Sequence, residues 1–212
     1  MPQQPPQFFL LSPASCSGQR AQLLLNERAT FELAVRVRGE AGATLGEVFS
    51  FLSGLYFRGK LTYARQFARG GSSFGAAIYV ITAGRGLLPH DTSVGLADLR
   101  AFAAVPIDLA EPRYREPLER DARRMAEQLP ADGRAVLLGS VATDKYVGVL
   151  GEALGERLLF PQDFAGRGDM SRGGLLLRCV AENRELDYVP IAGAVRRGVR
   201  PPKLPQRPTP RP

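Results

Sequence analysis

The chain has 212 residues, of which 44% are hydrophobic and 23% are charged. These are ordinary values for a globular protein, so they exclude collagen-like, coiled-coil and wholly disordered classes. The length predicts one domain. No apolar run approaches the ~20 residues that a membrane span needs, and residues 8–11 are too few for the core of a signal peptide. We therefore expect a cytoplasmic protein that does not contact a membrane.

Cysteine and histidine are rare in this chain. Its two cysteines, Cys16 and Cys179, exclude a disulfide scaffold and a zinc ribbon. Its one histidine, His90, excludes a histidine-rich metal site. The sequence therefore predicts no metal site and leaves the cofactor open.

The net charge of +7 is unevenly distributed. The last fourteen residues hold four basic and no acidic side chains, which leaves +3 on the remainder. Of the 28 basic residues, 25 are arginine, a bias that a GC-rich genome also produces. We therefore expect a nearly balanced body with a basic, proline-rich tail.

In the first third of the chain, short apolar runs alternate with turn residues. Residues 8–11 predict a buried strand. The strict alternation of residues 31–38 favours a strand, with a helix as the alternative. Thr44 and Glu47 form a capping box ahead of a helical stretch that we expect Gly54 and Gly59 to break.

Short apolar runs and helices with one apolar face predict the strands and helices of the remaining chain. Leu118, Ala122, Met125 and Leu129 form one face of a helix for which Pro117 is a suitable first-turn residue. The other expected elements are, in chain order, helix 19–28, strand 76–81, loop 82–93, helix 96–102, strand 135–139, helix 143–154, strand 157–160, helix 169–183 and strand 186–191.

Strands separated by helices predict a single three-layer α/β domain with a mainly parallel central sheet. We expect this domain at residues 8–193, between a disordered arm at 1–7 and a basic, disordered tail at 194–212. Ligands of such sheets bind beyond the carboxyl ends of the strands. Those ends are expected at three loops, 12–18, 82–91 and 139–145.

Several side chains in these loops are candidates for chemistry. Ser12 follows the first strand, where a small polar residue also simply forms a loop. A thiolate at Cys16 has a glycine and an arginine nearby, although an idle buried thiol is the alternative. His90 beside Asp91 forms a possible general base, and a surface loop histidine is the alternative.

Cations and carboxylates complete the predicted rim of the sheet. Arg85, Lys145 and Arg172 would suit an anionic or nucleotide ligand. Asp91 and Asp144 are the acid or base candidates, and helix capping is the alternative role for both. The sequence contains no phosphate loop, no G-x-G-x-x-G after a strand and no G-x-S-x-G elbow.

Five stretches of the chain, in order, resemble motifs of uncharacterised bacterial α/β proteins related to the YaaA peroxide-stress family. The signature I-S-A-x-Y-G-L-x-x-P-x-D of that group is similar to residues 81–92, I-T-A-G-R-G-L-L-P-H-D-T, which carry Gly-Arg where an aromatic is usual before the glycine. The other similar stretches are L-S-P-A at 11–14, L-Y-F at 55–57 with A-R-Q-F-A at 64–68, G-S-V-A-T-D-K-Y at 139–146 and G-D-M-S-R at 168–172.

The resemblance implies an α/β domain associated with DNA and oxidative damage. Related domains also occur beside base-modifying enzymes of tRNA and DNA, but the resemblance implies no known reaction. Three functions therefore stay open. The chain is a domain that binds DNA, RNA or a nucleotide, an enzyme acting on a nucleobase or nucleotide, or a scaffold whose tail binds a partner.

Overall fold

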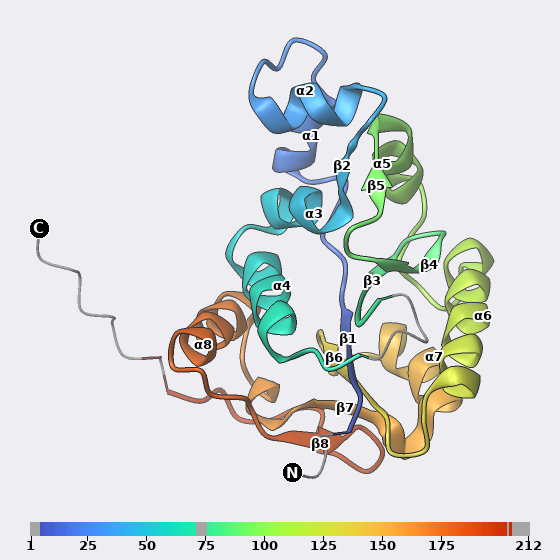
Figure 1. Ribbon diagram of the computed structural model, residues 1–212, viewed down its shortest axis with the longest axis vertical. Helices are drawn as coiled ribbons and strands as arrows, with labels where there is room; N and C mark the ends of the chain where they lie inside the picture. Colours follow the sequence, from blue (N-terminus) through green and yellow to red (C-terminus); the bar gives the residue numbers. More distant parts are fainter. Residues whose placement is uncertain (1–4, 71–75, 203, 205–212) are drawn as a thin grey trace, which may run out of the picture.

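The computed structural model describes residues 5–70, 76–202 and 204. Within them the chain forms an α/β fold around a six-stranded sheet, ordered β4-β3-β1-β6-β7-β8 (Figure 1). The parallel strands are β1 (Gln7–Leu11), β3 (Ile78–Thr82), β6 (Arg134–Leu138) and β7 (Leu158–Pro161). The antiparallel edges are β4 (Gly86–Pro89) and β8 (Tyr188–Pro190). This confirms the predicted α/β class and its mostly parallel sheet.

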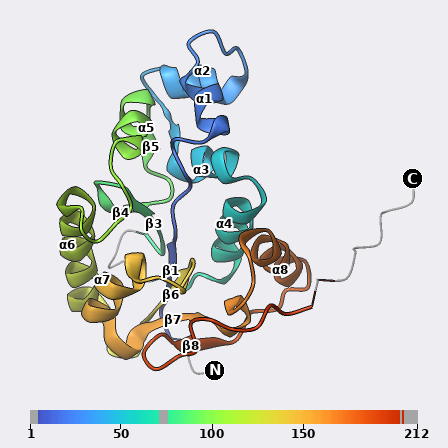
Figure 2. The same cartoon turned by 180° about the vertical axis from the view of Figure 1, so that it is seen from behind.

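Helices cover both faces of the sheet (Figures 1 and 2). On one face lie α4 (Leu55–Phe67) and α8 (Asp169–Ala181), and on the other lie α6 (Pro112–Gln128) and α7 (Asp144–Leu154). Two 3-10 turns, Gly155–Arg157 and Gln162–Phe164, flank β7. In the described part of the chain, no helix combines the length and apolar character required to cross a membrane.

A smaller layer, which we call the cap, lies beyond the carboxyl end of β1, at the top of Figure 1. It consists of α1 (Gln19–Leu25), α2 (Glu32–Arg38), α3 (Leu45–Ser53) and α5 (Leu96–Ala103). A two-stranded antiparallel ladder of β2 (Ala43–Thr44) and β5 (Ser93–Val94) joins it. The cap therefore stands over the edge of the sheet where α/β proteins bind ligands.

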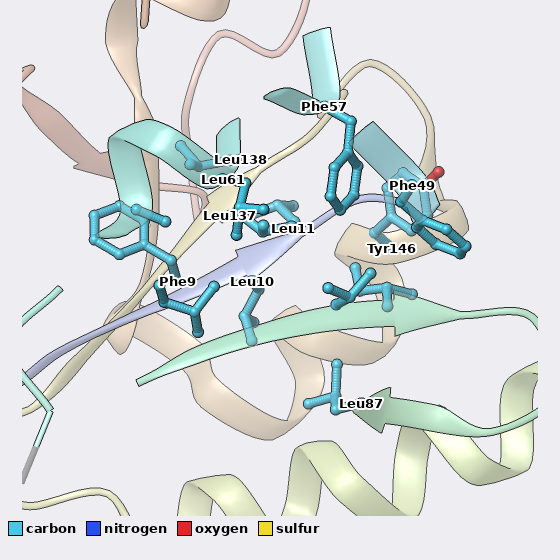
Figure 3. Close-up of a cluster of buried hydrophobic side chains, with 14 of the residues drawn as sticks. Phe9, Leu10, Leu11, Phe49, Phe57, Leu61, Leu87, Leu137, Leu138 and Tyr146 are labelled. Atoms are coloured by element: carbon cyan, nitrogen blue, oxygen red, sulfur yellow. The ribbon is translucent and has the colours of Figure 1, made fainter. Parts of the chain in front are cut away.

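Burial on both faces explains the short apolar strands. The side chains of β1 from Phe8 to Leu11 are fully buried because helices cover both sides of the sheet. Figure 3 shows Phe9, Leu10 and Leu11 packed among side chains of α3, α4 and β6, with Phe49 and Tyr146 beyond the end of the strand. This packing fixes the position of the residues that follow β1.

Two element predictions are wrong in the first third of the chain. Residues 31–38, favoured as a strand, form α2, in which Ala34 and Val37 are buried at helical spacing while Val35 is half exposed. Gly54 does separate α3 from α4, but Gly59 lies inside α4. Half of the predicted capping box is present, since the Thr44 hydroxyl accepts the backbone N–H of Glu47 at 3.3 Å, while the Glu47 carboxylate pairs with Arg36 instead of returning to Thr44.

Two further predictions are wrong in the middle of the chain. The loop predicted at 82–93 contains β4, which forms a hairpin with β3 through a turn with positive φ at Gly84 and Gly86. The helix predicted at Pro117 begins earlier, at Pro112, where the Glu111 side chain caps it. Its predicted apolar face is buried as expected.

The chain ends differ from the predicted arms where the structure describes them. Gln7, assigned to the N-terminal arm, is the first residue of β1 and is fully buried. Arg197 donates to the Ala142 carbonyl at 3.3 Å, so the start of the predicted tail lies against the loop after β6. The predicted disorder at residues 1–4, 203 and 205–212 lies outside the described residues.

Candidate functional site

A cavity of about 550 Å³ lies between the carboxyl end of the sheet and the cap. Three parallel strands lead into it, because Ser12 follows β1, Ala83 follows β3 and Ser140 lies just beyond β6. The chain passes from β1 to β3 on one side and later to β6 on the other side. The cavity therefore lies at the reversal of strand order, where open α/β sheets bind ligands.

The two walls of the cavity differ in chemistry. The wall made by the cap and the segment after α5 is mainly apolar, with Ser53 of α3 as a polar member. Its side chains are Phe49, Leu52, Phe102, Val105, Pro106 and Ile107. The wall made by the sheet and the starts of α7 and α8 is polar. Its side chains include Ser12, Ser15, Ser17, Ser140, Lys145 and Asp169.

Ser12 is held at the cavity by a buried lysine of α4. The Lys60 Nζ lies 2.5 Å from the Ser12 carbonyl oxygen and 2.8 Å from the Ser12 Oγ. Lys60 is 1% exposed and Ser12 is 5% exposed. Within the described chain Lys60 forms no ion pair. The nearby Asp169 carboxylate pairs with Arg172 instead, at 3.4 Å.

Burial of Lys60 favours its neutral form, whereas the aromatic rings beside it favour the ammonium. Its Nζ lies 4.4 Å from the ring centre of Tyr56 and 4.8 Å from that of Phe57, and both ring faces attract a cation. Burial lowers the pKa of Lys60 to about 7, and the Arg172 guanidinium acts in the same direction while Asp169 opposes it. A group with a pKa near neutrality can exchange protons with a bound ligand.

A close contact between α4 and α8 places Lys60 at the end of β1. A side chain at Gly59 would put its Cβ 2.8 Å from the Gly173 carbonyl oxygen. A side chain at Gly173 would put its Cβ 2.8 Å from the Tyr56 Cα. Both glycines are therefore needed for the two backbones to approach, and Lys60 lies one residue beyond this contact.

Tyr56 contributes a second buried polar group to the cavity. Its side chain lines the cavity and is 6% exposed. Its hydroxyl makes no hydrogen bond of normal geometry among the described residues, although the Arg172 and Ser12 side chains are near enough to lower its pKa. Burial raises the pKa of Tyr56 to about 12, so the hydroxyl keeps its proton. A buried hydroxyl without a partner is costly and is therefore a candidate to bind a ligand.

Two of the predicted ligand-binding residues also line the cavity. Lys145 lies in the first turn of α7, with its Nζ 5.1 Å from the ring centre of Tyr146. The Tyr114 hydroxyl donates to the Lys145 carbonyl at 2.6 Å and anchors this turn. Cys16 lines the cavity too, but burial raises the pKa of its thiol to about 12, which favours the alternative of an idle buried thiol.

Arg172 lies behind the cavity. It is 6% exposed, and its guanidinium donates to the Phe164 carbonyl at 3.3 and 3.1 Å. It therefore holds the start of α8 and lowers the pKa of Lys60, and it does not line the cavity itself.

The other candidate residues do not lie at the cavity. The prediction that all of them face one cleft is therefore wrong. Because β4 runs antiparallel to β3, it carries His90 and Asp91 back to the amino end of β3, where the backbone N–H of His90 donates to the Ile78 carbonyl at 3.2 Å. Arg85 stays in the hairpin turn and pairs with Asp98 at 2.7 Å.

Asp144 lies on α7 outside the cavity lining. Its carboxylate accepts two hydrogen bonds from Arg196, both at 2.7 Å. Together with Ala142 and Arg197 it borders a separate surface hollow. The acid and base candidates of the sequence are therefore not brought together. Among the described residues, no group of three His, Cys, Asp or Glu side chains is arranged to hold a metal ion.

No family model, curated protein or solved structure matches the chain. The candidate site therefore depends on its geometry alone.

The two buried groups of the site, Lys60 and Tyr56, were not predicted from the sequence. They are four residues apart, so they share one face of α4. Tyr56 lies on the buried face of α4, so a lysine four residues later on the same face is the signal that indicates a buried amine.

Proposed function

We propose that this chain binds a nucleotide-class ligand in the cavity at the carboxyl end of the sheet. The observation that carries the proposal is the pairing of an apolar, partly aromatic wall with a polar wall of hydroxyls and Lys145. A flat base packs on aromatic and aliphatic side chains, while a sugar and phosphate need hydrogen bonds and positive charge.

The polar wall offers a place for each polar part of a nucleotide. The first turn of α7 begins beside Lys145, and the Thr143 side chain forms no capping hydrogen bond there. A helix start and an adjacent lysine together favour a phosphate. Asp169 at the start of α8 is suited to accept hydrogen bonds from ribose hydroxyls.

The size of the cavity and the pairing of arginines favour a nucleotide over a duplex. Small-molecule pockets measure roughly 300–1,000 Å³, which includes this one at about 550 Å³. On α6, Arg115 pairs with Glu119, and Arg120 pairs with Asp121. This basic helix therefore neutralises much of its own charge and offers little to a phosphate backbone.

Each stretch that resembles the YaaA-related proteins contributes at least one residue to the cavity lining, which supports the proposal, although the signature at 81–92 contributes only Ala83. The cavity is lined by Ser12, Pro13 and Ala14 of the first stretch, by Ser140, Lys145 and Tyr146 of another, and by Asp169 of a third. The link to DNA damage or stress that the resemblance implies is part of this proposal. It is tested by whether the chain binds a nucleotide.

Isothermal titration calorimetry of the full chain with AMP, ATP, a single-stranded oligonucleotide and a duplex tests the proposal. We expect a nucleotide to bind with one site, and Lys145→Met to weaken its binding about tenfold, the loss of roughly one charge-assisted hydrogen bond. Arg123→Met is the matched control, since it removes an exposed cation of α6 and should leave the affinity unchanged. Binding of the duplex alone would overturn the proposal.

A further inference from the structure

We propose that Ser12, Lys60 and Tyr56 form a centre for acyl transfer on an ester or amide, with Ser12 as the nucleophile. This goes beyond binding, and it rests on the proposed function only in placing the substrate in the same cavity. The two catalytic partners come from one face of α4 and meet Ser12 where β1 ends.

The geometry of Ser12 suits a nucleophile. The side chain lines the cavity although it is 5% exposed, so a bound substrate reaches a hydroxyl that is shielded from bulk water. A Cβ at Gly139 would lie 2.9 Å from the Ser12 Cβ, so only glycine at the end of β6 leaves room for this serine. The hydroxyl is thereby held in place before the substrate arrives.

Lys60 is placed to act as the general base. Its Nζ lies 2.8 Å from the Ser12 Oγ, within the range for direct proton transfer. When neutral, the amine keeps one N–H on the Ser12 carbonyl and turns its lone pair to the hydroxyl. Burial lowers the pKa of Lys60 to about 7, so much of it is neutral at physiological pH. A serine with a lysine base is a known variant of the acyl-transfer triad.

Tyr56 supplies a donor for the developing oxyanion. The side chain lines the same cavity, and its buried hydroxyl makes no hydrogen bond of normal geometry among the described residues. Its ring lies 4.4 Å from the Lys60 Nζ, and the Ser12 side chain acts on its hydroxyl and lowers its pKa, so Tyr56 belongs to the same cluster. A preformed donor aimed at the site of charge development stabilises the tetrahedral intermediate.

The reaction balances without an oxidant or reductant. The Ser12 oxygen forms a bond to the acyl carbon while its proton passes to the Lys60 amine. The bond from the acyl carbon to the leaving alcohol or amine then breaks, and Lys60 returns the proton to that group. Water repeats the sequence, so it gives a proton to Lys60, its oxygen bonds to the acyl carbon, and Ser12 leaves with the proton.

Covalent labelling with an alkyl fluorophosphonate tests the proposal on the full chain. This probe phosphonylates activated serines and releases fluoride, and the mass of the intact protein reports the adduct. We expect one adduct, mapped to Ser12 by peptide mass, with a labelling rate that rises with pH around 7. Ser12→Ala should abolish the adduct, while Ser171→Ala, a serine outside the cavity lining, should retain the full rate.

The partners are tested by the rate of the same labelling. Lys60→Met should slow it about 100-fold and remove the rise near pH 7, and Tyr56→Phe should slow it by about 10- to 100-fold. The wild-type pH profile and Tyr56→Phe keep the test decisive if Lys60→Met does not fold. No adduct, an adduct at another residue, or an unchanged rate in a folded Lys60→Met would overturn the proposal.

The calorimetry separates this proposal from the proposed function. Nucleotide binding without labelling of Ser12 would refute acyl transfer alone. Labelling of Ser12 without nucleotide binding would refute the nucleotide alone.

Discussion

Burial of Lys60 destabilises the folded protein and also lowers the pKa of its amine. Its amine is 1% exposed, and its hydrogen bonds go to Ser12 while two aromatic rings cover it. Taking a charged amine out of water is unfavourable, and here no ion pair among the described residues offsets it. The structure therefore carries a destabilising group at the candidate site, which is typical of residues kept for chemistry.

The stability of the protein should rise with pH because of Lys60. Its pKa falls from 10.5 in the unfolded chain to about 7 in the folded one, so the unfolded state binds more protons between these values. The penalty is full below pH 7 and is relieved as the pH rises toward 10.5. Between pH 7.5 and 9, the free energy of unfolding should rise by ~2 kcal/mol relative to Lys60→Met. Urea titrations of both proteins measure this, and parallel pH profiles would contradict it.

At the scale of the elements, the contact between α4 and α8 positions the site. Gly59 and Gly173 bring the two backbones close enough for Tyr56 and Lys60 to reach the end of β1. The sequence led us to expect a helix break at Gly59, because glycine disfavours a helix interior. The close packing of a second helix outweighs that preference, and this partner is distant in the sequence.

Alanine substitution at two helix glycines should give opposite results. Gly59→Ala places a Cβ against the backbone of Gly173 and should lower the free energy of unfolding by about 1–3 kcal/mol. Gly151→Ala in α7 meets no atom within 4 Å and should raise it by roughly 0.5–1 kcal/mol through helix propensity. Urea denaturation of the two variants checks this, and equal effects would show that Gly59 is not needed for close packing.

At the scale of the whole molecule, the sheet was predictable and the site was only partly so. Buried parallel strands such as β1 and β6 are continuous apolar runs, and such runs can be recognised in the sequence. The prediction of one shared cleft is wrong where β3 is followed by an antiparallel strand. Successive loops lie at one edge of the sheet only when a crossover helix returns the chain and the next strand is parallel. For that reason Ser12 and Lys145 lie at the cavity, while His90 and Asp91 do not.

Removal of the basic tail should weaken non-specific nucleic-acid binding without changing nucleotide binding in the cavity. Deleting residues 199–212 takes away Arg200, Lys203, Arg207 and Arg211, while Arg196 stays paired with Asp144. Non-specific DNA binding should weaken, and its salt slope should fall by up to ~3.6, or ~0.9 for each phosphate that the tail no longer neutralises. The AMP affinity should stay within about twofold because none of the deleted residues that the structure describes, 199–202 and 204, lines the cavity. Fluorescence anisotropy over a salt series measures this, and an unchanged slope would identify the tail as a linker.

The central claim, that the cavity at the carboxyl end of the sheet is the functional site, is tested most directly by NMR. AMP is titrated into the ¹⁵N-labelled full chain, and the backbone amide shifts are mapped onto the structure. We predict that the shifts concentrate in residues 12–17 and 140–146 and at Asp169, the polar wall of the cavity. Shifts confined to α6 or to the tail, with these three segments unmoved, would contradict the account.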